Sequence, residues 1–241
     1  MKLSFLGTKG YIEESSSRHK YHSSLLIEHN KFRLLIDHGI VSRKLNMIRP
    51  NAILITHAHP DAFMWLLKDE KYDGKIYVTN ETKKLSKFDK NFEIIKPNKW
   101  FYVGPFKVMA YKVIHSLIAP AVGFKISIVK TKNKTKTLVY NPDLIVPENK
   151  SVLNGVDLYI GDGSSFMANL VRKKGNKLFG HARMSTQINW CMDYEIKNAI
   201  FTHLGKEPLR IGDKNLVNKL KHNKINGMNI SIAYDGMESE L

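Results

Sequence analysis

The chain has 241 residues, of which 43% are hydrophobic and only one, Cys191, is cysteine. The hydrophobic content supports a folded core. The single cysteine excludes an internal disulfide and a zinc site built from several thiolates. The formal charge of +16, from 38 Lys and Arg against 22 Asp and Glu, indicates an anionic partner such as a phosphate compound or nucleic acid, unless it only reflects lysine used as an ordinary surface residue.

The sequence shows no sign of a membrane segment or of repeated units. No stretch approaches the ~18 consecutive apolar residues of a transmembrane helix. The start of the chain, Met1 to Gly7, is too short and too alternating for a signal peptide. We expect residues 1–241 to form one cytoplasmic domain with no membrane association.

The first part of the chain predicts short strands separated by polar turns. A strand is expected over residues 2–6, a hairpin over 23–28 and 32–36, and a helix or turn over 42–47. The apolar run Ala52-Ile53-Leu54-Ile55 is typical of a strand buried on both faces. Helices are expected over 62–68 and 81–88, and strands over 76–79 and 93–95.

From residue 100 onward the pattern changes from hairpins to alternating strands and helices. Strands are expected over 100–102, 106–114, 121–129 and 137–140, with a hairpin tip at 131–136. A strand within 153–160 and strands at 199–202 and 229–233 alternate with helices at 164–174, 185–194 and 213–222. This mixture predicts an α/β fold of two sheets with helices packed outside them.

Several of the apolar strands run directly into an aspartate or a histidine. Residues i, i+2 and i+4 of an extended chain point the same way, so His57, His59 and Asp61 start on one side. Two imidazoles and a carboxylate at one point suit zinc, manganese or iron. The alternative is that Asp61 only caps a helix and the histidines are solvated. The regularity along the whole chain favours a metal site, because apolar strands run into Asp37, His57, His115 and His203, and Asp143 follows another strand after Asn141-Pro142.

Five motifs, taken in order, resemble those of the metallo-β-lactamase superfamily. The run Thr56-His57-Ala58-His59-Pro60-Asp61 resembles the His-x-His-x-Asp-His signature, and Ile114-His115-Ser116 resembles the next histidine motif. Asn141-Pro142-Asp143 resembles the bridging-aspartate motif. Gly180-His181 is similar to the histidine motif of the phosphodiesterase branch, which includes transfer-RNA 3′-end nucleases and small phosphodiesterases. Phe201-Thr202-His203 resembles the last ligand motif, so the resemblance covers about residues 3 to 205.

The resemblance implies a four-layer αββα sandwich with one or two divalent metal ions, zinc being expected and manganese or iron possible. It implies a first metal held by His57, His59 and His115, and a second held by Asp61 and His203 with Asp143 bridging both. It also implies Asp61 and His181 as catalytic residues, with His181 near the phosphate. Two such metals lower the pKa of a shared water, so that a hydroxide nucleophile exists at neutral pH.

One position departs from the superfamily pattern. Ala62 stands where the signature has its last histidine, so the second metal loses a ligand. His38 is a candidate substitute, although we expect the three remaining ligands to suffice. Asp37 and Asp162 are expected to orient ligands by hydrogen bonding rather than to bind metal. Four other histidines are expected on the surface: His19, His22, His29 and His222.

The combined features favour a phosphodiesterase acting on a nucleotide or nucleic acid. The short segment between His115 and Asp143 leaves room for a hairpin only, which favours a small substrate over full-length transfer RNA. The alternatives are a hydrolase of thioesters or lactones, and a non-catalytic protein whose second metal site has degraded at Ala62. A homodimer is expected from the superfamily, but no stretch of the sequence identifies an interface.

Overall fold

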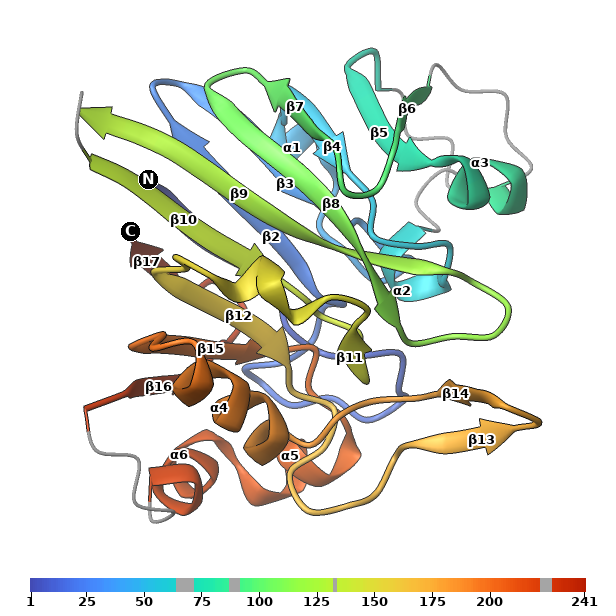
Figure 1. Cartoon of the computed structure of the whole chain (residues 1–241), viewed down its shortest axis with the longest axis vertical. Helices are drawn as coiled ribbons and strands as arrows, with labels where there is room; N and C mark the ends of the chain where they lie inside the picture. The colour runs from blue at the N-terminus through green and yellow to red at the C-terminus, as the bar shows by residue number, and fades with distance from the viewer. Residues whose placement is uncertain (64–71, 87–91, 132–133, 222–226) are drawn as a thin grey trace.

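The computed structural model describes residues 1–63, 72–86, 92–131, 134–221 and 227–241. Two β-sheets lie face to face in the middle of the molecule (Figure 1). The first sheet has seven strands in the order β17-β1-β2-β3-β4-β5-β6. Their bounds are β1 Lys2–Gly7, β2 Ser24–His29, β3 Phe32–Ile36, β4 Ala52–Leu54, β5 Lys75–Thr79, β6 Phe92–Ile95 and β17 Glu238–Glu240.

Local sequence explains the register of this first sheet. Strands β2 and β3 form the predicted hairpin, whose two turn residues Asn30 and Lys31 both have positive φ, 47° and 67°. This is the backbone that a two-residue hairpin turn requires. From β3 to β6 the strands are parallel, so their carboxyl ends lie along one edge of the sheet.

The second sheet has the order β11-β8-β9-β10-β12-β15-β16, and β7 also pairs with β8. Strands β8, β9 and β10 are antiparallel, whereas β10, β12, β15 and β16 are parallel. A separate two-stranded ribbon, β13 with β14, extends from the body (Figure 1). The bounds are β7 Trp100–Val103, β8 Phe106–Ile114, β9 Ala121–Thr131, β10 Lys134–Tyr140, β11 Val146–Pro147, β12 Leu158–Asp162, β13 Arg172–Lys174, β14 Lys177–Phe179, β15 Asn198–Thr202 and β16 Asn229–Ile232.

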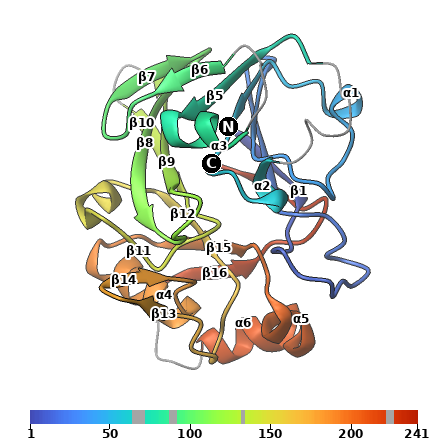
Figure 2. The same cartoon turned by 90° about the vertical axis from the view of Figure 1, so that its right-hand side faces the viewer.

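Helices cover the outer faces of both sheets (Figures 1 and 2). Against the first sheet lie α1 and α2, through Leu45, Ile48 and Phe63. Against the second lie α4 and α6, through Ile188, Trp190 and other apolar residues. The bounds are α1 Leu45–Ile48, α2 Pro60–Phe63, α3 Asn80–Ser86, α4 Met184–Asp193, α5 Lys206–Ile211 and α6 Asp213–Lys221, with a 3₁₀ turn at Lys150–Leu153.

Three hydrophobic cores correspond to the three contacts between these four layers. In β2, Leu25 and Ile27 enter the core between the sheets, whereas Leu26 enters the core beneath α1. This is the period of two expected for a strand buried on both faces. The predicted α/β architecture of two sheets with helices outside is therefore confirmed. No helix in the described part of the chain is long and apolar enough to cross a membrane.

The helix predicted over residues 164–174 is wrong. These residues form a loop that runs into β13. The Glu207 carboxylate accepts hydrogen bonds of 3.1 Å from the backbone N–H groups of Phe166, Met167 and Ala168, so these groups do not donate within a helix. The helices predicted near 185–194 and 213–222 are present as α4 and α6, although His222 lies outside the described residues. Most of the helix predicted over 62–68 also lies outside them, and the described part is α2, with Asp61 in its first turn.

Candidate metal centre

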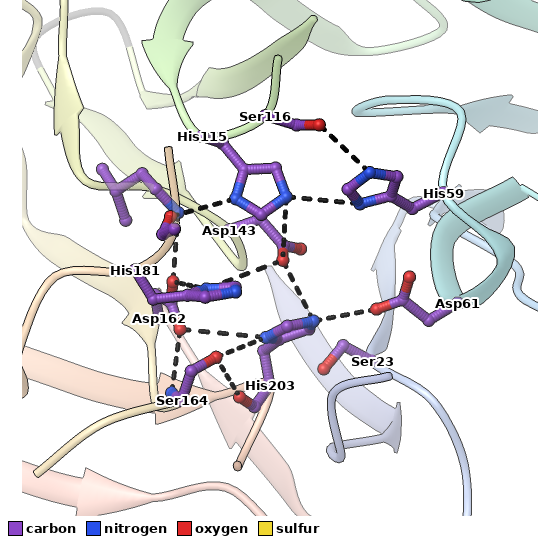
Figure 3. A network of polar contacts seen from close by, with 12 residues as sticks. Ser23, His59, Asp61, His115, Ser116, Asp143, Asp162, Ser164, His181 and His203 are labelled. Carbon is purple, nitrogen blue, oxygen red and sulfur yellow. Dashed lines mark hydrogen bonds and ion pairs between the residues drawn. The ribbon is translucent and has the colours of Figure 1, made fainter. Parts of the chain in front are cut away.

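The strand ends of both sheets deliver histidine and aspartate side chains to one place. The first sheet supplies its groups after β3 and β4, and the second supplies groups at or after β8, β10, β12 and β15. Figure 3 shows most of these side chains pointing toward one another from separate elements. The structure thus brings together residues separated by up to 146 positions in the sequence, from His57 to His203.

Three of the imidazoles form the first group of potential ligands. The ring centroids of His57, His59 and His115 lie 4.5 to 5.1 Å apart, and one ring nitrogen of each lies within 4.8 Å of the others. His57 is fully buried, and burial lowers its pKa well below the usual value. Burial also lowers the pKa of His115, to about 3. Both rings are therefore neutral near pH 7, which is the form that binds metals.

Hydrogen-bond partners decide which nitrogen of His57 faces the group. The Thr56 hydroxyl donates to the Asp37 carboxylate, so it accepts from the N–H at His57 Nδ1, 2.8 Å away. This leaves Nε2 unprotonated. The same Nε2 is buried and has no hydrogen-bond partner among the described residues. A buried, unprotonated nitrogen without a donor is well suited to a metal ion.

Two further rings follow the same rule. His115 Nδ1 lies 3.2 Å from the Gly180 carbonyl oxygen, which can only accept, so Nε2 carries the lone pair. The Ser164 hydroxyl donates to the His203 carbonyl oxygen, so it accepts from His203 Nδ1 at 2.9 Å. In both rings a neighbouring group holds the outward nitrogen. Burial opposes a charge on His203, but the Asp143, Asp162 and Asp61 carboxylates outweigh it and raise the pKa of the ring well above its usual value, so the inward Nε2 of His203 becomes a ligand only when it gives up its proton.

A second group of potential ligands combines Asp61, Asp143 and His203. His203 Nε2 lies 2.9 Å from Asp61 Oδ2 and 3.1 Å from Asp143 Oδ1. Burial raises the pKa of Asp143 to about 7, with the Asp61 charge adding to the effect. Burial opposes a charge on Asp61 too, but the hydrogen bond to His203 outweighs it and lowers the pKa of Asp61. Asp61 Oδ1 is buried with no hydrogen-bond partner among the described residues, so this group also fits a cation.

Asp162 and His181 form a third, adjoining pair. His181 Nδ1 lies 2.7 Å from Asp162 Oδ2. Burial disfavours charge on both residues, but their mutual attraction lowers the pKa of Asp162 and raises the pKa of His181. The side chain of His181 is 22% exposed, so a molecule entering from solvent can reach it. Asp162 is fully buried and also accepts from the backbone N–H groups of Leu144 and Ser164, so it holds two loops as well as the ring.

Solved structures of other proteins resemble this chain in fold, although their sequences are distant. No family model and no curated protein matches the sequence. Among solved structures, the metallo-β-lactamase fold protein YhfI from Bacillus subtilis has a TM-score of 0.72 at 18% identity, over 100% of this chain and 98% of its own. The chain described here has the metallo-β-lactamase fold.

Two other solved structures share that fold with the chain. A diphosphatase of the PhnP family has a TM-score of 0.69 at 16% identity, over 100% of this chain and 96% of its own. The short form of human tRNase Z has a TM-score of 0.67 at 16% identity, over 100% of this chain and 99% of its own. These similarities confirm the αββα metallo-β-lactamase fold expected from the motifs.

Ala62 stands at the position where the sequence signature has its last histidine. Ala62 is buried in α2, and its carbonyl oxygen accepts a hydrogen bond of 2.9 Å from the backbone N–H of His38. In the described part of the chain, His38 belongs to none of the clusters of side chains that could hold a metal ion. The structure therefore does not support His38 as the substitute for the missing histidine.

Two of the histidines predicted to be on the surface are buried instead. His19 is 2% exposed, and its Nε2 lies 2.9 Å from Asp213 Oδ1. His22 is also 2% exposed, and its Nδ1 accepts from the backbone N–H of Val41. Their polar neighbours in sequence suggested exposure, but the loop that carries them is covered by residues far away in the chain.

The residues that orient the ligands include three that sequence reasoning missed. Thr56 and Ser116 adjoin the candidate ligands His57 and His115 in sequence, and this adjacency was the available signal. Ser116 Oγ lies 3.2 Å from His59 Nε2. Ser164, which lies 39 residues before its partner His203, carried no such signal. Asp37 was expected to orient a ligand. In the structure its carboxylate accepts a hydrogen bond from the Thr56 hydroxyl, and this hydroxyl contacts His57 Nδ1.

Proposed function

We propose that the chain is a metal-dependent hydrolase of phosphodiesters, acting on a nucleotide or nucleic acid. The observation that carries this proposal is the set of inward-facing ligand atoms in two adjoining groups, next to a histidine that is held by a buried carboxylate. The outward nitrogens of His57, His115 and His203 are each held by a neighbouring group, which turns the other ring nitrogen toward the shared space.

His57, His59 and His115 would hold one metal ion, and Asp61, Asp143 and His203 a second. Nitrogen and carboxylate donors without thiolates suit zinc, and manganese or iron would also be accepted. Such ions, when bound, supply a nucleophilic water at neutral pH and offset the negative charge of the transition state. The catalytic role of Asp61 in this proposal is to bind the second metal ion.

His181 is the proposed proton donor. Burial opposes a charge on the ring, but Asp162 holds its Nδ1 and raises the pKa of His181 above the usual value, which favours the protonated form. Hydrolysis forms a bond from the water oxygen to phosphorus and breaks a phosphorus–oxygen ester bond, and the departing oxygen needs a proton. The second nitrogen of a protonated His181 can supply it, because the ring is partly exposed to the cavity above the site.

The net charge and the two named hydrolases support phosphate as the substrate's reacting group. A charge of +16 attracts anions. A diphosphatase and a tRNase Z share the fold across the whole chain. The buried Ala62 favours one competing reading, in which the second metal group no longer functions and the protein only binds its ligand.

The deciding experiment measures metal content and turnover on the same preparation. We expect one to two zinc ions per chain by elemental analysis, and hydrolysis of bis(p-nitrophenyl) phosphate that stops on chelation and returns when zinc is added. An activated lactone and a thioester are assayed beside it. Turnover of these two alone would assign a different substrate class, and stoichiometric metal without turnover of any substrate would establish the binding protein.

A further inference from the structure

A cavity of about 440 Å³ opens directly above the candidate metal centre. Its floor consists of side chains from both ligand groups together with His181: His59, Asp61, His115, Asp143, His181 and His203. The lining also includes four residues of different character, Tyr11, Ile12, Ala168 and Leu170, which are together called the wall. A charged floor and an apolar wall thus meet in one cavity.

The loop that carries Tyr11 crosses the candidate centre itself. A Cβ atom added at Gly10 would lie 2.9 Å from Cε1 of the His203 ring, so only glycine lets the backbone approach so closely. The Gly10 N–H donates to the Leu204 carbonyl oxygen at 3.0 Å, directly after the candidate ligand. Tyr11 is the next residue, so its side chain starts at the edge of the ligand cluster.

This loop is held in place on both sides of Tyr11. The buried Lys9 ammonium donates to the Ile12 carbonyl oxygen at 3.0 Å. The Glu14 carboxylate forms an ion pair of 2.8 Å with Lys206 in α5. The Tyr11 ring makes an edge contact with the buried His22, with centroids 6.0 Å apart. Tyr11 is nevertheless 65% exposed, so a rigid loop presents a large aromatic surface to solvent.

The charged groups at the rim of the cavity have partners within the protein. Lys206 pairs with Glu14. Glu207 accepts from the three backbone N–H groups of residues 166–168. What the cavity offers beyond its floor is therefore apolar and aromatic surface. A flat ring joined to an anionic centre would satisfy both the wall and the floor.

We infer that this wall is a subsite for a planar aromatic substituent of the substrate, with Tyr11 as the stacking surface and Leu170 as a further apolar residue lining the same cavity. A nucleobase and a simple aryl group share this chemistry. The inference rests on the proposed function, because it places the reacting anion of the substrate on the floor of the same cavity. Tyr11 contacts the substrate away from the reacting atoms, so it determines specificity.

The test compares matched ligands that differ only in the ring, by calorimetric titration of the zinc-loaded protein. The pairs are phenylphosphonate with methylphosphonate, uridine 5′-monophosphate with ribose 5-phosphate, and benzoate with acetate. In the wild-type protein we expect the ligand with the ring to bind about tenfold more tightly. Tyr11→Ala should bring this ratio close to one without weakening the ligand that lacks the ring, and Tyr11→Phe should keep it. Tyr102→Ala, which removes a tyrosine 71% exposed in β7, is the control.

The outcomes separate the subsite from the proposed function. A ring preference in the phenylphosphonate pair alone assigns a simple aryl group, and one in the uridine pair assigns a nucleobase. If benzoate binds with a Tyr11-dependent preference while no phosphonate or phosphate binds, the subsite stands and the phosphodiesterase proposal fails. A protein that prefers the ring in none of the three pairs, or keeps its preference in Tyr11→Ala, overturns the subsite.

Discussion

At the residue scale, the candidate centre depends on small polar groups that turn each imidazole the right way. The hydroxyls of Thr56 and Ser164 and the carbonyl group of Gly180 each occupy one ring nitrogen. The other nitrogen then faces the shared space. Such orienting groups commonly contribute a factor of ~10 to 100 in metal affinity, so ligand identity alone does not describe the site.

Substitution at His59 should differ in kind from substitution at His181. His59→Ala removes one of three nitrogens of the first group, so we expect it to lose both metal and turnover. His181→Ala leaves both groups intact, so metal content should stay unchanged while kcat falls by ~10²- to 10⁴-fold. Elemental analysis and steady-state kinetics on the same samples measure both effects. Normal turnover by His181→Ala would remove its assigned role.

Substitution at Ala62 tests the missing ligand. Ala62→His restores an imidazole at a buried position next to Asp61, so we expect occupancy of the second group to rise toward two metals per chain. Ala62→Leu fills the same space without a ligand atom and serves as the control. Equal metal content in wild type and Ala62→His would mean that the second group is already saturated by three protein ligands.

At the element scale, the β13–β14 ribbon concentrates positive charge next to the site. Lys174 and Lys177 are exposed and directly opposite each other, an arrangement that is unfavourable for like charges. Neither forms an ion pair with any residue that the structure describes. The ribbon ends at Phe179, and the N–H of the next residue, Gly180, donates to the His115 carbonyl oxygen at 2.7 Å. An anionic chain lying along the ribbon would therefore pass close to the centre.

The ribbon yields a prediction about salt. If both lysines contact phosphates, the variant Lys174→Gln/Lys177→Gln should reduce the slope of log affinity against log salt by about 1.4 for a single-stranded oligonucleotide. Fluorescence anisotropy at several salt concentrations measures that slope. The control Lys197→Gln/Lys219→Gln removes two exposed charges elsewhere, one of them at the opposite end of β15 from His203. Equal slopes in the two variants would leave the ribbon without a role in binding.

At the scale of the whole molecule, the candidate metal centre joins the two halves of the sandwich. His57, His59 and Asp61 follow the first sheet, whereas His115, Asp143 and His203 follow the second. Each of the two ligand groups contains side chains from both sheets. A bound metal would therefore cross-link the sheets at the edge of the core that lies between them.

Chelation should accordingly lower the stability of the whole fold. A ligand present at 100 times its dissociation constant adds about 2.7 kcal/mol to the free energy of unfolding if it binds only the folded state. Thermal unfolding with and without chelator should show a lower Tm without metal. In His59→Ala the chelator should have a much smaller effect. An identical Tm for the wild-type protein in both conditions would argue against metal bridging of the sheets.

The sequence by itself determined the strands and the residues with which they end. Apolar runs such as Ala52-Ile53-Leu54-Ile55 are local signals, and in a two-sheet fold with parallel strands the side chains at strand ends gather at one edge. The order of the motifs then predicted the metallo-β-lactamase fold, which is confirmed. The metal-binding roles of the individual residues remain predictions.

Only the tertiary structure decided which groups surround those residues. Glu207 takes up the N–H groups of residues 166–168 from 39 to 41 positions away, within the loop that stands where a helix was predicted. His19 is buried because Asp213, 194 positions later, lies against it. Ser164 holds Nδ1 of His203, and the aromatic wall depends on a loop crossing at Gly10. Contacts across such distances leave no periodicity in the sequence, because they depend on packing between elements rather than on local backbone preference.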